Sequence, residues 1–174
     1  MRATSLTCLS LAVAGLALVG ADATATEQPV AKEVSSTQGT AWLNRQMAAL
    51  AERHGGAGWR TTVSGLRWRQ IAGDGSGARP GPTDPVTVHY VGTFVDGSEF
   101  DSSVRRGEPA TFPLNRVIKG WQEGVTLMGV GDKFEFAIPY QLAYGPAGRG
   151  PIPGHATLLF TVELLSIDRP PARP

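Results

Sequence analysis

The chain has 174 residues, of which 41% are hydrophobic and 18% are charged, a length typical of one domain with short additions. This composition is too apolar for a disordered chain, and 22 glycines and 13 prolines exclude a long coiled coil. Sixteen basic and 15 acidic residues leave a net charge of +1, which argues against a nucleic-acid binder. Three histidines and one cysteine are too few to predict a multi-ligand zinc site or a disulfide within the chain.

Residues 1–25 are predicted to be a secretory signal peptide. Arg2 supplies the positive charge, residues 6–19 form an apolar run, and Ala23-Thr24-Ala25 is a small-residue cleavage pattern. The run is shorter than the ~20 residues that span a bilayer, so we expect no stable membrane span, with an uncleaved anchor as the alternative. Cleavage would also remove Cys8, and a mature chain without thiols suits the periplasm or the exterior.

Residues 26–60 are predicted to contain a polar leader, up to Gln38, and one amphipathic helix at residues 40–54. Thr40 is the expected N-cap, and Gly55-Gly56 is the expected end. The apolar positions recur at helical spacing and form a narrow stripe of Leu43, Met47, Leu50 and His54. We expect this stripe to pack on the chain's own domain and the protein to be a monomer. A dimer through residues 40–54 is the alternative.

Residues 61–168 are predicted to form the main domain, which is rich in strands. Alternating apolar and polar residues predict strands at residues 66–71, 86–94, 99–102, 110–114, 134–138 and 157–167. Asp96-Gly97 predicts a hairpin, and the broad apolar face of residues 117–128 predicts one helix. The expected fold is α+β, with an antiparallel half-barrel sheet of five or six strands wrapped around one short helix and preceded by a short amino-terminal helix. Residues 169–174 are expected to be a flexible tail.

The sequence carries none of the common catalytic motifs, such as Gly-x-Ser-x-Gly, a phosphate-binding loop with lysine, or His-Glu-x-x-His. Aromatic residues are instead spread over the hairpin, the helix, the last strand and a loop at residues 139–156 that is long enough to suggest a function. These aromatics are Tyr90, Phe100, Trp121, Tyr144 and Phe160. One interpretation is an ordinary core. However, Tyr144-Gly145-Pro146 would make a poor core wall, and a cleft for a small apolar ligand such as a prolyl ring is the other interpretation.

Five motifs in this order resemble FKBP-type peptidyl-prolyl isomerases over roughly residues 80–167. They are Val88-His89-Tyr90-Val91-Gly92, Asp96-Gly97-x-x-Phe100-Asp101-Ser102-Ser103, Val117-Ile118-Lys119-Gly120-Trp121, Leu142-Ala143-Tyr144-Gly145 and Ile152-Pro153-Gly154-His155-Ala156-Thr157-Leu158. Residues 61–66 are similar to the domain entry of secreted bacterial members such as the macrophage infectivity potentiator group.

The resemblance implies an enzyme that rotates X-Pro bonds in unfolded or nascent polypeptides, without a covalent intermediate, cofactor or metal. It implies that catalysis involves Tyr90, Phe100, Asp101, Trp121, Tyr144 and Phe160. It implies that substrate also contacts Phe112, Val117, Ile118, Arg149 and Ile152. Asp101 would be a polar partner of Tyr90, paired with Arg106, or alternatively a residue that only stabilises a turn. A chaperone or client-binding module with little turnover is the alternative function.

Three residues depart from the pattern of the best-known members of this family. Ala110 stands where those members carry an aromatic residue, Arg116 where they carry an acid, and Arg149 where a histidine is common. Binding of macrolide inhibitors is implied by the family and made doubtful by these departures. The two arginines either favour acidic residues beside the proline or are simply solvated.

Overall fold

The computed structural model describes the backbone of residues 30–168 and the side chains of residues 39–168. The predicted signal peptide with Cys8, the first residues of the leader, and the tail at residues 169–174 lie outside this part of the chain. Within it, no helix is both long and apolar enough to cross a membrane.

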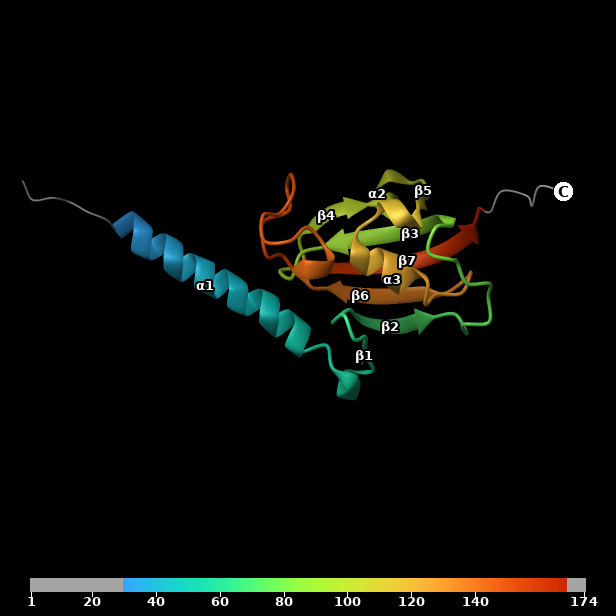
Figure 1. The fold of residues 1–174 in the computed structure, drawn as a ribbon, viewed down its shortest axis with the longest axis horizontal. Helices are drawn as coiled ribbons and strands as arrows, with labels where there is room; N and C mark the ends of the chain where they lie inside the picture. The colour runs from blue at the N-terminus through green and yellow to red at the C-terminus, as the bar shows by residue number, and fades with distance from the viewer. Residues whose placement is uncertain (1–29, 169–174) are drawn as a thin grey trace, which may run out of the picture.

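One antiparallel sheet forms the body of the molecule, as expected from the alternating pattern (Figure 1). Its strands are β1 (Arg60–Thr61), β2 (Arg67–Ala72), β3 (Pro85–Thr93), β4 (Glu99–Ser102), β5 (Ala110–Pro113), β6 (Lys133–Ile138) and β7 (Leu158–Ile167). The order across the sheet is β1-β2-β6-β7-β3-β4, and β5 also pairs with β3. The described chain thus has seven strands rather than five or six, because β1 is a two-residue strand that the sequence pattern does not show.

Strand β3 shows how the sheet acquires two different faces. Side chains alternate along a strand, and in β3 every second residue from Val86 is buried while the intervening residues are partly exposed. Strand β7 continues this alternation beside it, with Gly92 opposite Phe160 and Thr93 opposite Leu159. The buried side chains of both strands join the core around Trp121 and Val125 of helix α3 (Lys119–Val125).

Helix α3 is shorter than the helix predicted at residues 117–128. Val117 and Ile118 are extended, and Ile118 is the N-cap, with its carbonyl accepting from the backbone N–H of Trp121 at 2.9 Å. Three helical segments of single-turn length complete this region: α2 (Ser103–Arg106), η2 (Leu114–Arg116) and η3 (Tyr140–Leu142). Figure 1 shows α3 and α2 near the strands β3, β4 and β7. The extended backbone before α3 turns Val117 and Ile118 toward the same cavity as Trp121.

The amino-terminal helix α1 runs over Val30–Ala51, so it begins well before the expected N-cap Thr40. The interpretation of residues 26–38 as an unstructured leader is therefore wrong from Val30 onward. The helix also ends before Gly55-Gly56, which belong to the 3-10 turn η1 (Gly55–Ala57). Figure 1 shows α1 extending away from the sheet, with only its carboxyl-terminal part close to the rest of the molecule.

Helix α1 does dock on the chain's own domain, but through a different face from the one predicted. Gln46 is 3% exposed, and its side-chain oxygen accepts from the backbone N–H of Thr157 at 2.9 Å. The indole of Trp42 donates to the carbonyl of Gly154 at 3.2 Å. Leu43 and Met47, which were expected to pack, are 40% and 69% exposed. The docking face is thus held by polar contacts that hydrophobic periodicity does not report.

Candidate active site

An aromatic cavity of about 430 Å³ lies on the α3 side of the sheet, at the end of α3 where the chain enters the helix. This volume falls within the range of small-molecule and cofactor sites. Residues from β3, β4, β5, β7, α3 and two connecting segments line it: Tyr90, Phe100, Asp101, Phe112, Arg116, Val117, Ile118, Trp121, Ala143, Tyr144, Arg149 and Phe160.

Trp121 is the centre of the aromatic cluster. Its ring meets those of Tyr90 and Phe160 edge-on, with centroids 5.3 Å away in each case, and that of Phe112 at 6.0 Å. Edge-to-face pairs at such distances are attractive and fix the ring orientations. Trp121 is only 4% exposed, and its indole N–H has no hydrogen-bond partner among the residues described. Trp121 therefore gives the cavity an aromatic floor, and its indole N–H is a hydrogen-bond donor without a partner among the described residues.

Gly92 on β3 makes room for two of the aromatic walls. A Cβ at this position would lie 2.7 Å from the ring of Phe100 and 2.8 Å from that of Phe160. These two rings meet edge-on with centroids 5.5 Å apart. Any larger residue at position 92 would force one of the rings to move, so glycine sets the position of this wall.

A polar network closes one side of the cavity. The phenol of Tyr90 donates to one oxygen of Asp101, and Arg106 pairs with the other oxygen. Arg106 also donates to the phenol oxygen of Tyr90 at 3.0 Å. Asp101 thus has both partners expected from the sequence, and its neighbour Ser102 is the residue that caps α2 through Arg105. Ser102 caps α2, and the Asp101 carboxylate also accepts from the backbone N–H of Ser102, so the two roles of Asp101 are compatible.

This network shifts the ionisation of its members. Burial acts to raise the pKa of Asp101, but hydrogen bonds from Tyr90 and Arg106, with the charge of Arg106, hold this pKa below its ordinary value. Burial and the hydrogen bond to Asp101 raise the pKa of the Tyr90 phenol. Hydrogen bonds to Tyr90 and Asp101 raise the pKa of Arg106. Near neutral pH the cavity therefore holds a carboxylate, a guanidinium and a neutral phenol.

The structure brings ten of the eleven residues proposed from the sequence to this one cavity. The exception is Ile152, which is 7% exposed and lies in the core behind the loop. Its backbone N–H and C=O bond to those of Arg149 at 2.9 Å each, so it supports the loop rather than lining the cavity. Ala143 lines the cavity and was missed, since a lone alanine carries no chemical signal beyond its place before Tyr144.

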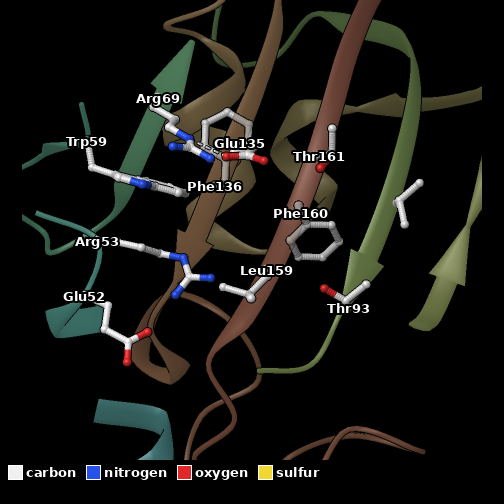
Figure 2. A pocket seen from close by; sticks show the side chains of 11 residues that line it. Glu52, Arg53, Trp59, Arg69, Thr93, Glu135, Phe136, Leu159, Phe160 and Thr161 are labelled. Atoms are coloured by element: carbon white, nitrogen blue, oxygen red, sulfur yellow. Dashed lines mark hydrogen bonds and ion pairs between the residues drawn. The ribbon is translucent and has the colours of Figure 1, made fainter. Parts of the chain in front are cut away.

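A second cavity, of about 340 Å³, lies on the opposite face of the same strands (Figure 2). Four charged residues are among those that line it, Glu52, Arg53, Arg69 and Glu135. Arg69 pairs with Glu135, and the guanidinium groups of Arg53 and Arg69 stack on Trp59 at 5.5 and 5.0 Å. Such walls do not suit a prolyl ring. Within the described residues no group of three or more metal-binding side chains is found. The aromatic cavity is therefore the better candidate for the active site.

Comparisons with known proteins agree with this geometry. The family described as "FKBP-type peptidyl-prolyl cis-trans isomerase" matches residues 77–165. The chain is 56% identical over 126 residues to the FKBP-type isomerase FkpA of Aeromonas hydrophila, covering 72% of this chain and 46% of that protein. It is 46% identical over 107 residues to the outer membrane protein MIP of Legionella longbeachae, covering 61% of this chain and 46% of that protein.

Among solved structures, the crystal structure of FkpA from Escherichia coli has a TM-score of 0.69 at 37% identity. That match covers 79% of this chain and 65% of the FkpA chain. The chain spans about half the length of the relatives whose sequences it matches. The match over residues 77–165 includes strands β3 to β6, helix α3 and β7 as far as residue 165, and so includes every residue that lines the aromatic cavity. The chain belongs to the FKBP-type peptidyl-prolyl cis-trans isomerase family.

Proposed function

We propose that this protein catalyses cis–trans isomerisation of X-Pro bonds in unfolded or partly folded polypeptides. The observation that carries the proposal is the aromatic cavity, in which Trp121 meets Tyr90, Phe112 and Phe160 edge-on. Such a cavity fits a flat apolar ring the size of proline. Two of the relatives bear the name of this activity, FkpA of Aeromonas hydrophila and the 22 kDa isomerase of Escherichia coli, the latter 57% identical over 111 residues.

The physical task is to lower the barrier to rotation about the amide bond. Twisting the bond breaks its resonance and costs ~18–20 kcal/mol, so uncatalysed exchange takes tens to hundreds of seconds. The twisted amide is less dipolar than the planar one, and an apolar site that excludes water favours it over the ground state. This is preferential binding of the transition state, and it needs no nucleophile.

We assign roles to the lining residues on this basis. Trp121 forms the floor beneath the prolyl ring, and Tyr90, Phe100 and Phe160 form the walls. Phe112, Val117 and Ile118 extend the apolar surface on the side where the chain enters α3. The backbone N–H of Ile118 and the phenol of Tyr144 are the proposed donors to substrate carbonyls.

Asp101 is proposed to orient the substrate through its network with Tyr90 and Arg106. As a carboxylate fixed by two donors, it keeps the phenol of Tyr90 in one orientation and leaves the cavity wall rigid. A rigid wall matters because small displacements of a bound group sharply reduce the rate.

The direct test is protease-free NMR exchange spectroscopy on a short Leu-Pro peptide with catalytic amounts of the purified protein. The proposal predicts faster cis–trans exchange of the peptide. Unchanged exchange in the presence of folded protein would contradict it.

We propose a periplasmic or secreted location. The supporting observations are the signal-peptide pattern of residues 1–25 and the relative named as an outer membrane protein. Mass spectrometry of the mature amino terminus, isolated from an exporting host, tests cleavage after Ala25.

A client-binding chaperone is the second candidate, and the exposed apolar side chains of α1 favour it. Leu43 and Met47 lie outside the docking face of α1, and their side chains are exposed. If they hold clients, Leu43→Ser with Met47→Ser will abolish protection of an aggregating protein while peptide isomerisation continues.

The same two side chains bear on the oligomeric state. We propose a monomer, because the two exposed apolar residues in the part of α1 whose side chains the structure describes would bury too little area for a stable interface. Sedimentation equilibrium at micromolar concentration tests this. A dimer dispersed by the same double substitution would instead support assembly through residues 40–54.

A further inference from the structure

Two arginines stand at the rim of the aromatic cavity. Arg116 is the last residue of η2, and Arg149 lies in the loop between η3 and β7. Both side chains line the cavity, and both residues are exposed. Among the residues described, neither guanidinium group has a carboxylate partner.

The backbone beneath each arginine is held in place. Leu114, two residues before Arg116, is fully buried, and its N–H donates to the carbonyl of Asp84 at 3.1 Å. Arg149 exchanges two backbone hydrogen bonds with buried Ile152. The backbone therefore fixes where each arginine side chain begins on the rim, although the side chains themselves can move.

The charges around the cavity do not balance. Asp101 is the one acidic residue that lines it within the described part of the chain, and Arg106 already pairs with Asp101. Arg116 and Arg149 are left as two uncompensated positive charges beside an apolar cavity. An apolar wall of low dielectric strengthens the attraction of such charges for an anion compared with open solvent.

We infer, resting on the proposed function, that this enzyme favours an aspartate or glutamate beside the proline over the corresponding amide or a lysine at the same position. With the prolyl ring on Trp121, a neighbouring Cα lies about 3.8 Å from the prolyl Cα across a trans bond and about 2.9 Å across a cis bond. The side chains of the neighbouring residues then emerge at the rim, where the two guanidinium groups can accept a carboxylate. An exposed ion pair of this kind changes kcat/KM by about twofold to fivefold.

The test compares two peptide series that differ in one residue beside the proline, Glu, Gln or Lys, placed before it in one series and after it in the other. NMR exchange spectroscopy measures kcat/KM for each peptide at low salt and at 1 M salt. We expect Glu to exceed Gln by about twofold to fivefold and Lys to fall below Gln in at least one series. The preference should fade at 1 M salt, where the screening length is about 3 Å.

Variants assign the effect to the rim. Arg116→Gln and Arg149→Gln should each reduce the ratio of Glu to Gln, and the double variant should bring it to about one. Arg45→Gln removes one exposed positive charge from α1, away from the cavity, and should leave the ratio unchanged.

The outcomes separate this inference from the function on which it rests. No acceleration of any peptide would overturn the isomerase proposal itself. Equal rates for Glu and Gln in both series, with clear acceleration of each, would overturn the inference alone and would mean that the arginines are merely solvated. A ratio that falls equally in Arg45→Gln would also overturn it, because the effect would then come from net charge.

Discussion

The two faces of one sheet carry two cavities of opposite chemistry. On the α3 side, Tyr90 and Phe160 point toward Trp121 and build an aromatic cavity of about 430 Å³. On the other side, Leu159 and Thr161 flank the same Phe160 along β7 and face charged walls around about 340 Å³ (Figure 2). Strand alternation separates most of their lining residues, because neighbouring residues point to opposite faces, while Phe160 borders both cavities. The two volumes are similar, so the chemistry of the walls, more than size, singles out the candidate active site.

The sharpest way to break this comparison is to remove one tryptophan from each cavity. Trp121→Ala and Trp59→Ala should each lower the free energy of unfolding by about 3–5 kcal/mol, since both rings are buried. Only Trp121→Ala should also lower kcat/KM, by about a hundredfold, because it removes about 3 kcal/mol of apolar contact with the substrate. Urea denaturation and NMR exchange measure the two effects.

Trp121→Phe is a second variant for the case in which Trp121→Ala does not fold, because it keeps an aromatic ring at the floor of the cavity. Equal loss of catalysis in Trp59→Ala and Trp121→Ala, with both variants folded, would mean that the aromatic cavity has no special role.

A second test changes one side chain on each face of β3. Gly92→Ala would push Phe100 or Phe160 from its place, and we expect kcat/KM to fall by more than about tenfold and stability by about 1–3 kcal/mol. Thr93→Ala, on the opposite face, is the matched control and should leave kcat/KM unchanged. If Gly92→Ala is as active as the wild type, the walls are not held where we place them.

The polar network gives a smaller and pH-dependent effect. Asp101→Asn should lower kcat/KM by about tenfold at pH 7, because the charge-assisted hydrogen bonds that hold Tyr90 are lost. Since the pKa of Asp101 is lowered in the folded protein, its stabilising contribution is complete above the unfolded value of about 3.9 and is lost as the pH falls through the folded value.

Activity of the wild type should accordingly stay level from neutral pH down to about pH 4. A midpoint near pH 6 would show that the carboxylate is not held by Tyr90 and Arg106. Asp74→Asn, which changes an exposed carboxylate away from the cavity, is the control for net charge.

The smallest effect concerns helix α1, where the adjacent residues Gln46 and Met47 differ sharply in burial. Gln46→Ala leaves the buried N–H of Thr157 without its partner and should cost about 1 kcal/mol of unfolding free energy. Met47→Ala, at a side chain 69% exposed, should change it by less than about 0.5 kcal/mol. Both should keep full isomerase activity. Urea denaturation measures both losses. A larger loss of unfolding free energy in Met47→Ala than in Gln46→Ala would support the apolar docking face expected from the sequence.

The strands and the aromatic cavity could be predicted from the sequence because both follow from local patterns. Alternation placed the faces of β3 and β7, and ordered motifs placed Tyr90, Trp121 and Tyr144 on the elements that meet at the cavity. Helix α1 could not be predicted in the same way. Its docking depends on Gln46 and Trp42 bonding to backbone atoms more than 100 residues away, and hydrophobic periodicity is blind to such contacts.

Two further differences between expectation and structure have the same origin in long-range packing. Val117 and Ile118 share the apolar spacing of the helix that follows, but the chain is extended there and starts the helix only at Lys119. Ile152 belongs to a recognised motif, yet its side chain is drawn into the core while its backbone holds Arg149. In both cases tertiary packing decides what local sequence leaves open.

The most direct test of the central claim is to observe the tryptophan indole resonances by NMR while a Leu-Pro peptide is added to the wild-type protein. Trp59 and Trp121 report on the two faces of the sheet, one in each cavity. The account predicts that the signal of Trp121 shifts with peptide concentration, that the signal of Trp59 does not, and that cis–trans exchange of the peptide accelerates at the same time. Acceleration accompanied by a shift of Trp59 alone would contradict it.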